Sequence, residues 1–253
     1  MTTQPPPRSS RPPRHGVARV ISKLGIGSRS QAVQWVGAGR VRVNGQLVRD
    51  PEFPVRQGHD QIEVSGRDSA SAERLVLMLN KPRGLVTTTQ DEHGRATVYS
   101  CLAGAELPWL APIGRLDKAS EGLLLFSNDP VWAARITDPA SGPDKTYHVQ
   151  IDRLPDASLL AALQHGVTLD GERLSVRSAR CLRSGGKNAW LEVVLSEGRN
   201  RHMRRLLAAF DVSVLRLVRV AIGPLSLGEL AKGQWRMLTD SEIDSLNRQD
   251  WSA

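Results

Sequence analysis

The chain has 253 residues, of which 40% are hydrophobic, so it can bury the core of one large domain or of two smaller ones. Its 34 Lys and Arg against 26 Asp and Glu give a formal net charge of +8, which favours a polyanionic partner such as a nucleic acid, although basic proteins without such a partner are common. The sequence shows no apolar run of membrane-spanning length, no signal-peptide pattern and no motif for a nucleotide, flavin or metal, so we expect a cytoplasmic protein with no cofactor and no metal.

Changes of composition divide the chain into four parts. Residues 1–15 are rich in Pro, Arg and Ser and contain no acid, so they predict a disordered basic tail that cannot bury a core. Residues 65–73 are small and polar, which is typical of a linker. These two segments delimit a small module over residues 16–64 and a larger module over residues 74–245.

The small module is predicted to contain two short helices and a β-hairpin. The first helix ends at Gly25, and the second starts after Ser28 as its N-cap and ends just beyond Val36. Asn44 and Gly45 lie between two runs of alternating apolar and polar residues, which is the strongest short signal for a hairpin. We therefore expect a small α/β module.

The first strand of this hairpin is predicted to carry a basic face. Arg40 and Arg42 alternate with Val41 and Val43, so a strand would place the arginines on one face and the valines on the other. Such a face either binds RNA phosphates or is simply solvated, and the sequence leaves both readings open. The candidate RNA-binding residues of the module are Arg29, Arg40, Arg42 and Asn44.

The larger module is predicted to be α+β. A helix is expected over residues 157–164, with Asp156 as its N-cap and Gly166 just beyond its end, and another helix is expected from Asn200. Strands and helices do not alternate strictly, which favours a mixed, mostly antiparallel central sheet with flanking helices over a Rossmann fold. The expected strands are residues 74–79, 122–127, 146–151, 189–195 and 212–220.

Asp117 stands just before a strand that is predicted to be fully buried. It follows Arg115 in the stretch GRLDKASEGLLLFSND, residues 114–129. A carboxylate beside buried apolar residues is either charged and paired or neutral with a raised pKa. Asp117 can therefore serve chemistry or merely cap the turn that follows it, and the spacing alone leaves both possibilities open.

Four arginines crowd into the stretch SEGRNRHMRRLLAAF. Apolar residues at i, i+3, i+4 and i+7 from Met203 predict the buried stripe of a helix. Arg201, Arg204 and Arg205 would share roughly one face of that helix, so one guanidinium can point into a cleft while the others bind phosphates. An ordinary solvated basic face is disfavoured, because Glu197 is the only acid in the stretch.

Tyr147 is one of only two tyrosines in the chain. In the predicted strand it shares a face with Lys145 and Val149. Its ring could stack on a nucleic-acid base, because an aromatic ring accepts the face of any base. A core tyrosine with a bonded hydroxyl is the commoner arrangement, so the residue alone does not decide.

Taken together, four sequence blocks resemble the ribosomal pseudouridine synthases, the family that modifies uridines of the small and large ribosomal subunits. The blocks are NKPRG at 80–84, GRLDKASEGLLLFSND at 114–129, DKTYHV at 144–149 and EGRNRHMRR at 197–205. Residues 222–243 resemble the closing segment of that family, and the small module is similar to the alpha-L RNA-binding domain first described in a ribosomal protein. The resemblance runs in order through about residues 17–245.

The resemblance implies roles for individual side chains. Asp117 would be the catalytic carboxylate, Tyr147 would stack on the uracil and assist removal of the proton at carbon 5, and Arg204 would form an ion pair with Asp117. Met203 would fill the apolar contact beside Arg204. The further substrate contacts would be Arg115, Arg199, Arg201, Arg205 and Lys81.

The implied reaction is the isomerisation of one uridine to pseudouridine in ribosomal RNA. The reaction involves no redox change and no group transfer, so it needs no cofactor. Residues 87–98 look more like the large-subunit members, which favours 23S over 16S RNA, either free or within an assembling large subunit. We expect a monomer that requires neither a protein partner nor a membrane.

Two other functions are weighed against this one. A non-catalytic RNA-binding or ribosome-assembly factor with the same fold would be expected to have lost Asp117 or Tyr147, and both are present. A metal-dependent nuclease would need a cluster of carboxylates for its ion, and the sequence shows none.

Overall fold

The computed structural model describes residues 14–66, 74–89 and 91–248. The predicted tail and linker therefore lie almost entirely outside the described residues. The chain divides into two compact units, residues 1–73 and 74–253, which are called the N-terminal and the C-terminal unit below. Within the described residues, no helix combines the length and the apolar character that a membrane crossing requires.

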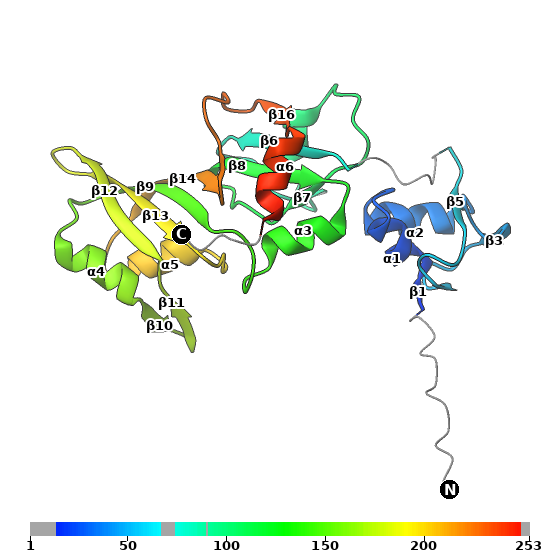
Figure 1. Cartoon of the computed structure of the whole chain (residues 1–253), viewed down its shortest axis with the longest axis horizontal. Coiled ribbons are helices and arrows are strands. Elements are labelled where there is room, and N and C mark those ends of the chain that lie inside the picture. Colours follow the sequence, from blue (N-terminus) through cyan, green and yellow to red (C-terminus); the bar gives the residue numbers. More distant parts are fainter. Residues whose placement is uncertain (1–13, 67–73, 90, 249–253) are drawn as a thin grey trace, which may run out of the picture. The chain divides into compact units, whose positions relative to one another are not determined.

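The N-terminal unit packs two helices against short strands (Figure 1). Ser28 caps the second helix: its hydroxyl accepts from the Gln31 N–H at 3.0 Å, and the Gln31 side chain accepts from the Ser28 N–H. The strands pair in the order β3-β2-β5, with β1 and β4 as a separate pair. The elements are β1 (His15–Gly16), α1 (Val17–Lys23), α2 (Arg29–Gly37), β2 (Val41–Val43), β3 (Gln46–Val48), β4 (Pro54–Val55) and β5 (Ile62–Val64).

The hairpin of the N-terminal unit has the predicted turn. Asn44 and Gly45 both have positive φ, 50° and 79°, as a type I′ turn requires. Val41 and Val43 are buried, while Arg42 between them is exposed. The predicted alternation of this strand is thereby confirmed.

The C-terminal unit is built on one large sheet (Figure 1). Its strands run in the order β12-β13-β9-β14-β8-β6-β16, with β7 paired to β8 and β15 paired to β14. The strands are β6 (Val76–Lys81), β7 (Ala111–Ile113), β8 (Glu121–Ser127), β9 (Lys145–Ile151), β12 (Ser178–Ser184), β13 (Ala189–Leu195), β14 (Val214–Ile222), β15 (Leu225–Ser226) and β16 (Trp235–Met237). A separate hairpin consists of β10 (Val167–Leu169) and β11 (Glu172–Leu174).

The pairing between β8 and β14 differs from the rest of this sheet. The other recorded pairs of the sheet are antiparallel, whereas β8 and β14 run parallel. Their register covers only Val218 opposite Glu121 and Arg219 opposite Gly122. The predicted mixed, mostly antiparallel α+β fold is confirmed.

Helices cover both faces of the sheet. Met78 and Leu125 share one apolar cluster with Trp132 of α3 (Pro130–Thr137) and Leu246 of α6 (Asp240–Asn247). The neighbouring strand residues Leu77, Leu79, Leu124 and Phe126 point the other way, into a second cluster that includes residues of α4 (Ala157–His165) and α5 (His202–Ala208). This alternation is what a strand buried on both faces requires.

The predicted elements and the observed ones differ at identifiable points. The five predicted strands are present, with ends shifted by at most two residues, and Asp156 caps α4 by accepting from the Leu159 N–H at 2.7 Å. The helix expected from Asn200 starts at His202 instead, because Arg201 has a φ of 50°, which a right-handed helix cannot include.

Candidate active site

Asp117 lies in a firmly held loop between β7 and β8. The Ser120 N–H donates to the Asp117 carbonyl at 2.9 Å, and the Thr87 hydroxyl donates to the Leu116 carbonyl at 2.8 Å. Leu116 is buried, while Asp117 is half-buried. In the described part of the chain, no hydrogen bond is recorded to the Asp117 carboxylate oxygens, so the side chain does not cap the turn and remains available to a ligand.

Lys81 is hydrogen-bonded to the backbone of this loop. The prediction that Lys81 contacts substrate is wrong, because its side chain is fully buried. Its ammonium donates to the carbonyls of Ser120 at 2.8 Å, Pro82 at 3.1 Å and Asp117 at 3.2 Å. Burial lowers the pKa of Lys81 to about 8, and the nearby Asp117 charge opposes that change. Lys81 therefore acts on the loop rather than on a substrate.

A cavity of about 500 Å³ opens beside the loop, a size that suits a small ligand or a single nucleotide. Asp117, Tyr147 and Met203 line it, together with Arg204. A second cavity of about 550 Å³ shares Asp117 and Arg204 with the first. Asp117 thus lines both cavities.

Arg204 reaches the loop but does not form the predicted contact. Its guanidinium donates to the carbonyls of Val214 at 3.2 Å and Ala119 at 3.4 Å. Among the described residues no ion pair within 4.0 Å joins Arg204 to Asp117, so the expected direct pair is absent. Burial and the charge of Arg201 lower the pKa of Arg204, while the Asp117 charge acts the other way. The two groups therefore attract each other across the site.

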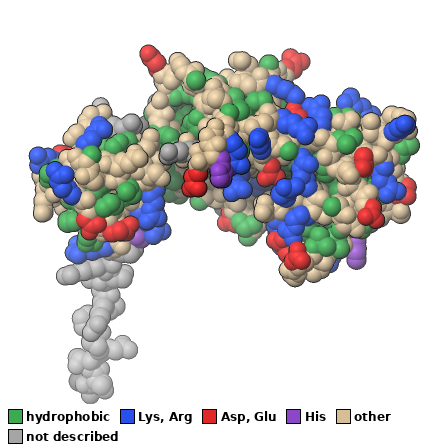
Figure 2. Space-filling view, turned by 180° about the vertical axis from the view of Figure 1, so that it is seen from behind, with side chains coloured by type: hydrophobic (Ala, Val, Ile, Leu, Met, Phe, Trp, Pro, Cys, Tyr) green, Lys and Arg blue, Asp and Glu red, His purple; other side chains and the backbone are tan. Residues whose placement is uncertain are grey.

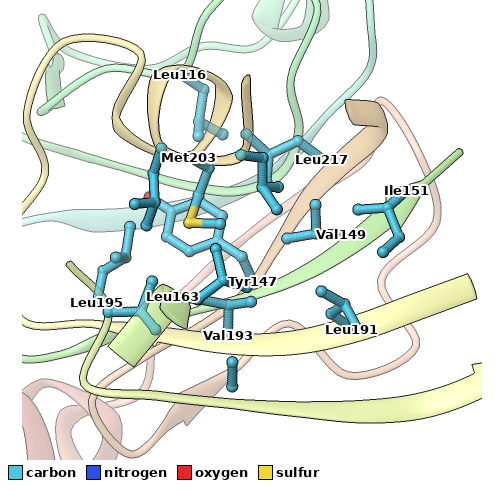
Figure 3. Close-up of a cluster of buried hydrophobic side chains, with 14 of the residues drawn as sticks. Leu116, Tyr147, Val149, Ile151, Leu163, Leu191, Val193, Leu195, Met203 and Leu217 are labelled. Atoms are coloured by element: carbon cyan, nitrogen blue, oxygen red, sulfur yellow. The ribbon is translucent and has the colours of Figure 1, made fainter. Parts of the chain in front are cut away.

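Tyr147 and Met203 form the apolar wall of the first cavity. Both belong to the buried cluster shown in Figure 3, with Tyr147 8% and Met203 2% exposed. Tyr147 comes from β9 and Met203 from α5, so a strand and a helix converge here. The small exposed part of Tyr147 lies on the cavity wall, where a flat ring could stack against it.

The arginines of the α5 region fall into two groups. Arg199 and Arg205 were predicted to bind phosphate, yet Glu172 of β11 pairs with both, and Arg199 also pairs with Glu197 at 2.8 Å. Arg201 is exposed and lines both cavities. Of the predicted substrate contacts, the first cavity also brings in Arg115 and Arg199, but not Arg205.

The predicted RNA contacts of the N-terminal unit are exposed but already engaged. Arg29 pairs with Glu52 at 3.3 Å, and the guanidiniums of Arg40 and Arg42 donate to backbone carbonyls. The Asn44 side chain bridges Asp60 and the Gln61 backbone. These bonds hold the four side chains in place, and their binding of RNA stays a prediction.

Positive charge gathers on the surface of the C-terminal unit. Figure 2 shows Lys and Arg side chains crowded over one face of this unit, with Asp and Glu scattered among them. Such a surface attracts a polyanion and makes its binding sensitive to salt. Within the described residues, no group of three His, Cys, Asp or Glu side chains is placed to hold a metal ion.

Sequence reasoning missed two cations of the first cavity, Lys145 and Arg219. Arg219 is buried, and its Nε donates to the Leu123 carbonyl at 2.7 Å. An arginine between valines in the apolar stretch LVRVAI was a signal of a buried charge that the sequence offered. The signal for Lys145 is its place on the same strand face as Tyr147, two residues away.

Comparison with known proteins matches both units to family models. A model described as "RNA pseudouridylate synthase" matches residues 75–209, and one described as "S4 domain" matches residues 17–62. The chain belongs to the RNA pseudouridylate synthase family. The resemblance drawn from the four sequence blocks and the N-terminal module is confirmed.

Relatives within this synthase family match over nearly the whole chain. An "Uncharacterized RNA pseudouridine synthase" of Aquifex aeolicus is 34% identical and covers 91% of this chain and 92% of its own length. "Ribosomal large subunit pseudouridine synthase B" of Bacillus subtilis is 34% identical, with 90% and 93% covered. A solved structure described as "Crystal structure of pseudouridylate synthase" is 31% identical, with a TM-score of 0.63 over 92% of this chain and 99% of that one.

Proposed function

We propose that the protein converts a specific uridine of ribosomal RNA to pseudouridine, with Asp117 as the catalytic carboxylate and without a cofactor. One observation carries the proposal: the loop presents an unbonded, half-buried Asp117 carboxylate to a nucleotide-sized cavity whose wall includes Tyr147. Family membership supplies the reaction type, and the relative from Bacillus subtilis carries a name that refers to the large ribosomal subunit.

The reaction breaks the bond between N1 of uracil and C1′ of ribose and rejoins the base through C5. Asp117 can serve it as a nucleophile toward the sugar or the base, or as a base toward the sugar. Lys81 fixes the backbone around Asp117, and the Arg204 guanidinium provides an attracting positive charge nearby. Tyr147 would stack on the uracil, and Met203 would pack beside it.

RNA binding must offset the cost of taking the target nucleotide out of its stack, which is a few kcal/mol. The exposed Arg115 and Arg201 at the cavity are placed to hold phosphates. Arg199 and Arg205 would contribute after exchanging Glu172 for phosphate. Binding should therefore weaken steeply as salt is raised.

The two units take separate parts in this proposal. Residues 16–64 would form an RNA-binding domain and residues 74–245 the catalytic domain, in agreement with the two family matches and with the division of the chain at residue 73. The substrate would be 23S rather than 16S RNA, on the basis of residues 87–98 and the name of the large-subunit relative. We propose a cytoplasmic monomer without a required protein partner.

The test is the release of tritium from [5-³H]uridine in unmodified ribosomal RNA transcripts, because C5 loses its hydrogen when the new bond forms. Wild type should release tritium from the 23S transcript, and Asp117→Asn should release none while binding the RNA as tightly as wild type. The matched control is Asp211→Asn: Asp211 is exposed and has a φ of 55°, which Asn tolerates. Turnover retained by Asp117→Asn would refute the role of Asp117.

A further inference from the structure

Two cations share the inner end of the first cavity. Lys145 lies two residues before Tyr147 on β9, so their side chains are on the same face of the sheet. Arg219 of β14 is directly opposite Tyr147 in the antiparallel register, which places its side chain on that face as well. Lys145, Arg219 and Tyr147 all line the cavity that Asp117 borders.

These cations lack acidic partners at contact distance. The described residues contain no hydrogen bond of the Lys145 ammonium and no ion pair within 4.0 Å for Lys145 or Arg219. Arg219 is 5% exposed, and its Nη2 is buried without a hydrogen-bond partner. Burial and the Arg219 charge lower the pKa of Lys145 to about 8, whereas Asp144 and Asp138 oppose this at longer range.

Two unpaired positive charges in a partly dry space are unfavourable unless a negative charge arrives there. Arg219 cannot turn away, because its Nε is tied to the Leu123 carbonyl of β8. The Lys145 ammonium, with no acceptor of its own, is free to meet a ligand in the cavity. The arrangement therefore fits an anion, or an oxygen that becomes anionic.

The position of the pair favours the base of a nucleotide over its phosphate. Arg115 and Arg201 are exposed and line the same cavity, so phosphates on the outside of a nucleotide can reach them. Arg219, by contrast, is buried. In a uridine nucleotide the carbonyl edge of the base and the phosphate lie on opposite sides of the glycosidic bond.

We propose that the Lys145 ammonium binds a carbonyl oxygen of the target uracil and stabilises the negative charge that the base acquires during isomerisation, with Arg219 as a fixed second charge behind it. This inference rests on the proposed function. The inference adds to the site a residue that stabilises negative charge on the base. It also gives a role to the buried Arg219, which in the described part of the chain makes no recorded bond to the loop that carries Asp117.

The charge arises on either chemical route. If the C1′–N1 bond breaks first, its electron pair stays on the base, and the charge is shared among N1, O2 and O4. If Asp117 instead adds to C6, the displaced π pair moves through C5 to O4. On this second route the C1′–N1 bond breaks next, and the bond between Asp117 and C6 breaks at the end, which returns the free carboxylate. On both routes C5 forms the bond to C1′, C5 loses a proton and N1 gains one, so the composition of the nucleotide is unchanged. A donor preorganised at a carbonyl oxygen lowers the barrier of both routes.

The experiment uses single-turnover tritium release from the [5-³H]uridine-labelled 23S transcript, with enzyme in saturating excess, beside a separate measurement of RNA affinity. Lys145→Met should lower the saturated rate by about 10²-fold, the scale of one lost oxyanion donor. Its dissociation constant for RNA should stay within about threefold of wild type, since no phosphate contact is lost. Lys187→Met, the same change at an exposed lysine, is the matched control.

A pH profile separates a chemical role from a structural one. If the protonated amine is needed, the wild-type rate falls as pH rises through about 8, where Lys145 loses its proton. Lys145→Arg should recover most of the rate and keep it at higher pH, because a guanidinium stays charged. The groups facing this amine are Arg219 on β14, Asp144 beside β9 and Asp138 after α3, and they are unchanged in the variant.

Other outcomes overturn the inference. Lys145→Met could instead bind RNA more weakly, with the slope of log affinity against log salt reduced by about 1, while its saturated rate stays unchanged. That result would make Lys145 a phosphate contact. If Lys145→Met does not fold, identical pH profiles for wild type and Lys145→Arg would decide against the proposal. Wild type that releases no tritium from either ribosomal transcript would be a failure of the proposed function itself, which is a distinct result.

Discussion

Lys81 and Lys145 mark two regions of the C-terminal unit where the same side chain meets different surroundings. Burial lowers the pKa of each to about 8. Lys81 has three carbonyl acceptors and no exposure, whereas Lys145 lines a cavity, has no recorded acceptor among the described residues and lies near Arg219. A shifted pKa alone would not distinguish a structural lysine from a functional one, but a count of hydrogen bonds does.

The largest effect is expected at Gly122, which lies between the two regions. Gly122 is paired with Lys81 on one side and with Arg219 on the other, and its φ is 102°. A Cβ at this position would approach the Arg219 carbonyl oxygen to 2.2 Å. Gly122→Ala should lower the free energy of unfolding by more than about 3 kcal/mol, measured by urea denaturation. Gly186→Ala, in open space with no positive φ, is the control.

The next effect separates the two lysines directly. Lys81→Met removes three hydrogen bonds to backbone carbonyls and should lower the free energy of unfolding by about 2–4 kcal/mol. Lys145→Met has no such bonds to lose and should change it by less than about 1 kcal/mol. Urea unfolding of both variants checks the pair. Equal losses would mean that the two regions do not differ in the way described.

A smaller effect appears in the pH dependence of stability. Both lysines have a folded pKa near 8, below the ordinary value of 10.5, so between these values the unfolded chain binds more protons. Their contribution therefore makes the free energy of unfolding rise with pH above about 8. Between pH 8 and 10, the free energy of unfolding of Lys145→Met should rise less than that of wild type, as urea denaturation at each pH would measure. Burial raises the pKa of Cys101 and of Tyr99, which acts in the opposite direction but equally in both proteins.

The smallest effect concerns cations that are already paired. Glu172→Gln removes the carboxylate that holds Arg199 and Arg205, and should tighten RNA binding by about two- to fivefold at low salt. Its effect on stability should stay below about 1 kcal/mol, because the three side chains are half-buried at the surface and water screens their ion pairs. Filter binding measures the affinity, with Glu192→Gln as the control, since Glu192 pairs with Arg180 instead. Weaker binding by Glu172→Gln would show that the acid helps to position the arginines for RNA.

Much of the fold was predictable because local signals were strong. Local signals of this kind are the turn at Asn44 and Gly45, the caps at Ser28 and Asp156, and the apolar run over residues 123–126, all of which depend on residues close in sequence. Strand β12 was missed because it is mostly exposed and carries no apolar run. The late start of α5 was missed because Arg201 takes a left-handed conformation without being glycine.

The site was predictable as a set of blocks, but not as a set of contacts. The resemblance drew attention to Asp117, Tyr147 and Arg204, and the structure places all three on one cavity. It could not show that Lys81 is buried under the loop, because that depends on the pairing of β6 with β8. The resemblance also could not show that Glu172 forms ion pairs with Arg199 and Arg205, which follow it by about thirty residues in the sequence.

The short parallel junction between β8 and β14 divides the large sheet into two halves. One half carries the start of β8 and the loop with Asp117, and the other carries Tyr147 and Lys145 on β9. The junction spans two backbone pairs, reinforced by the bond from Arg219 to Leu123. Because the acid comes from one half and the tyrosine from the other, the spacing of these two groups is set across this one junction and not within either half.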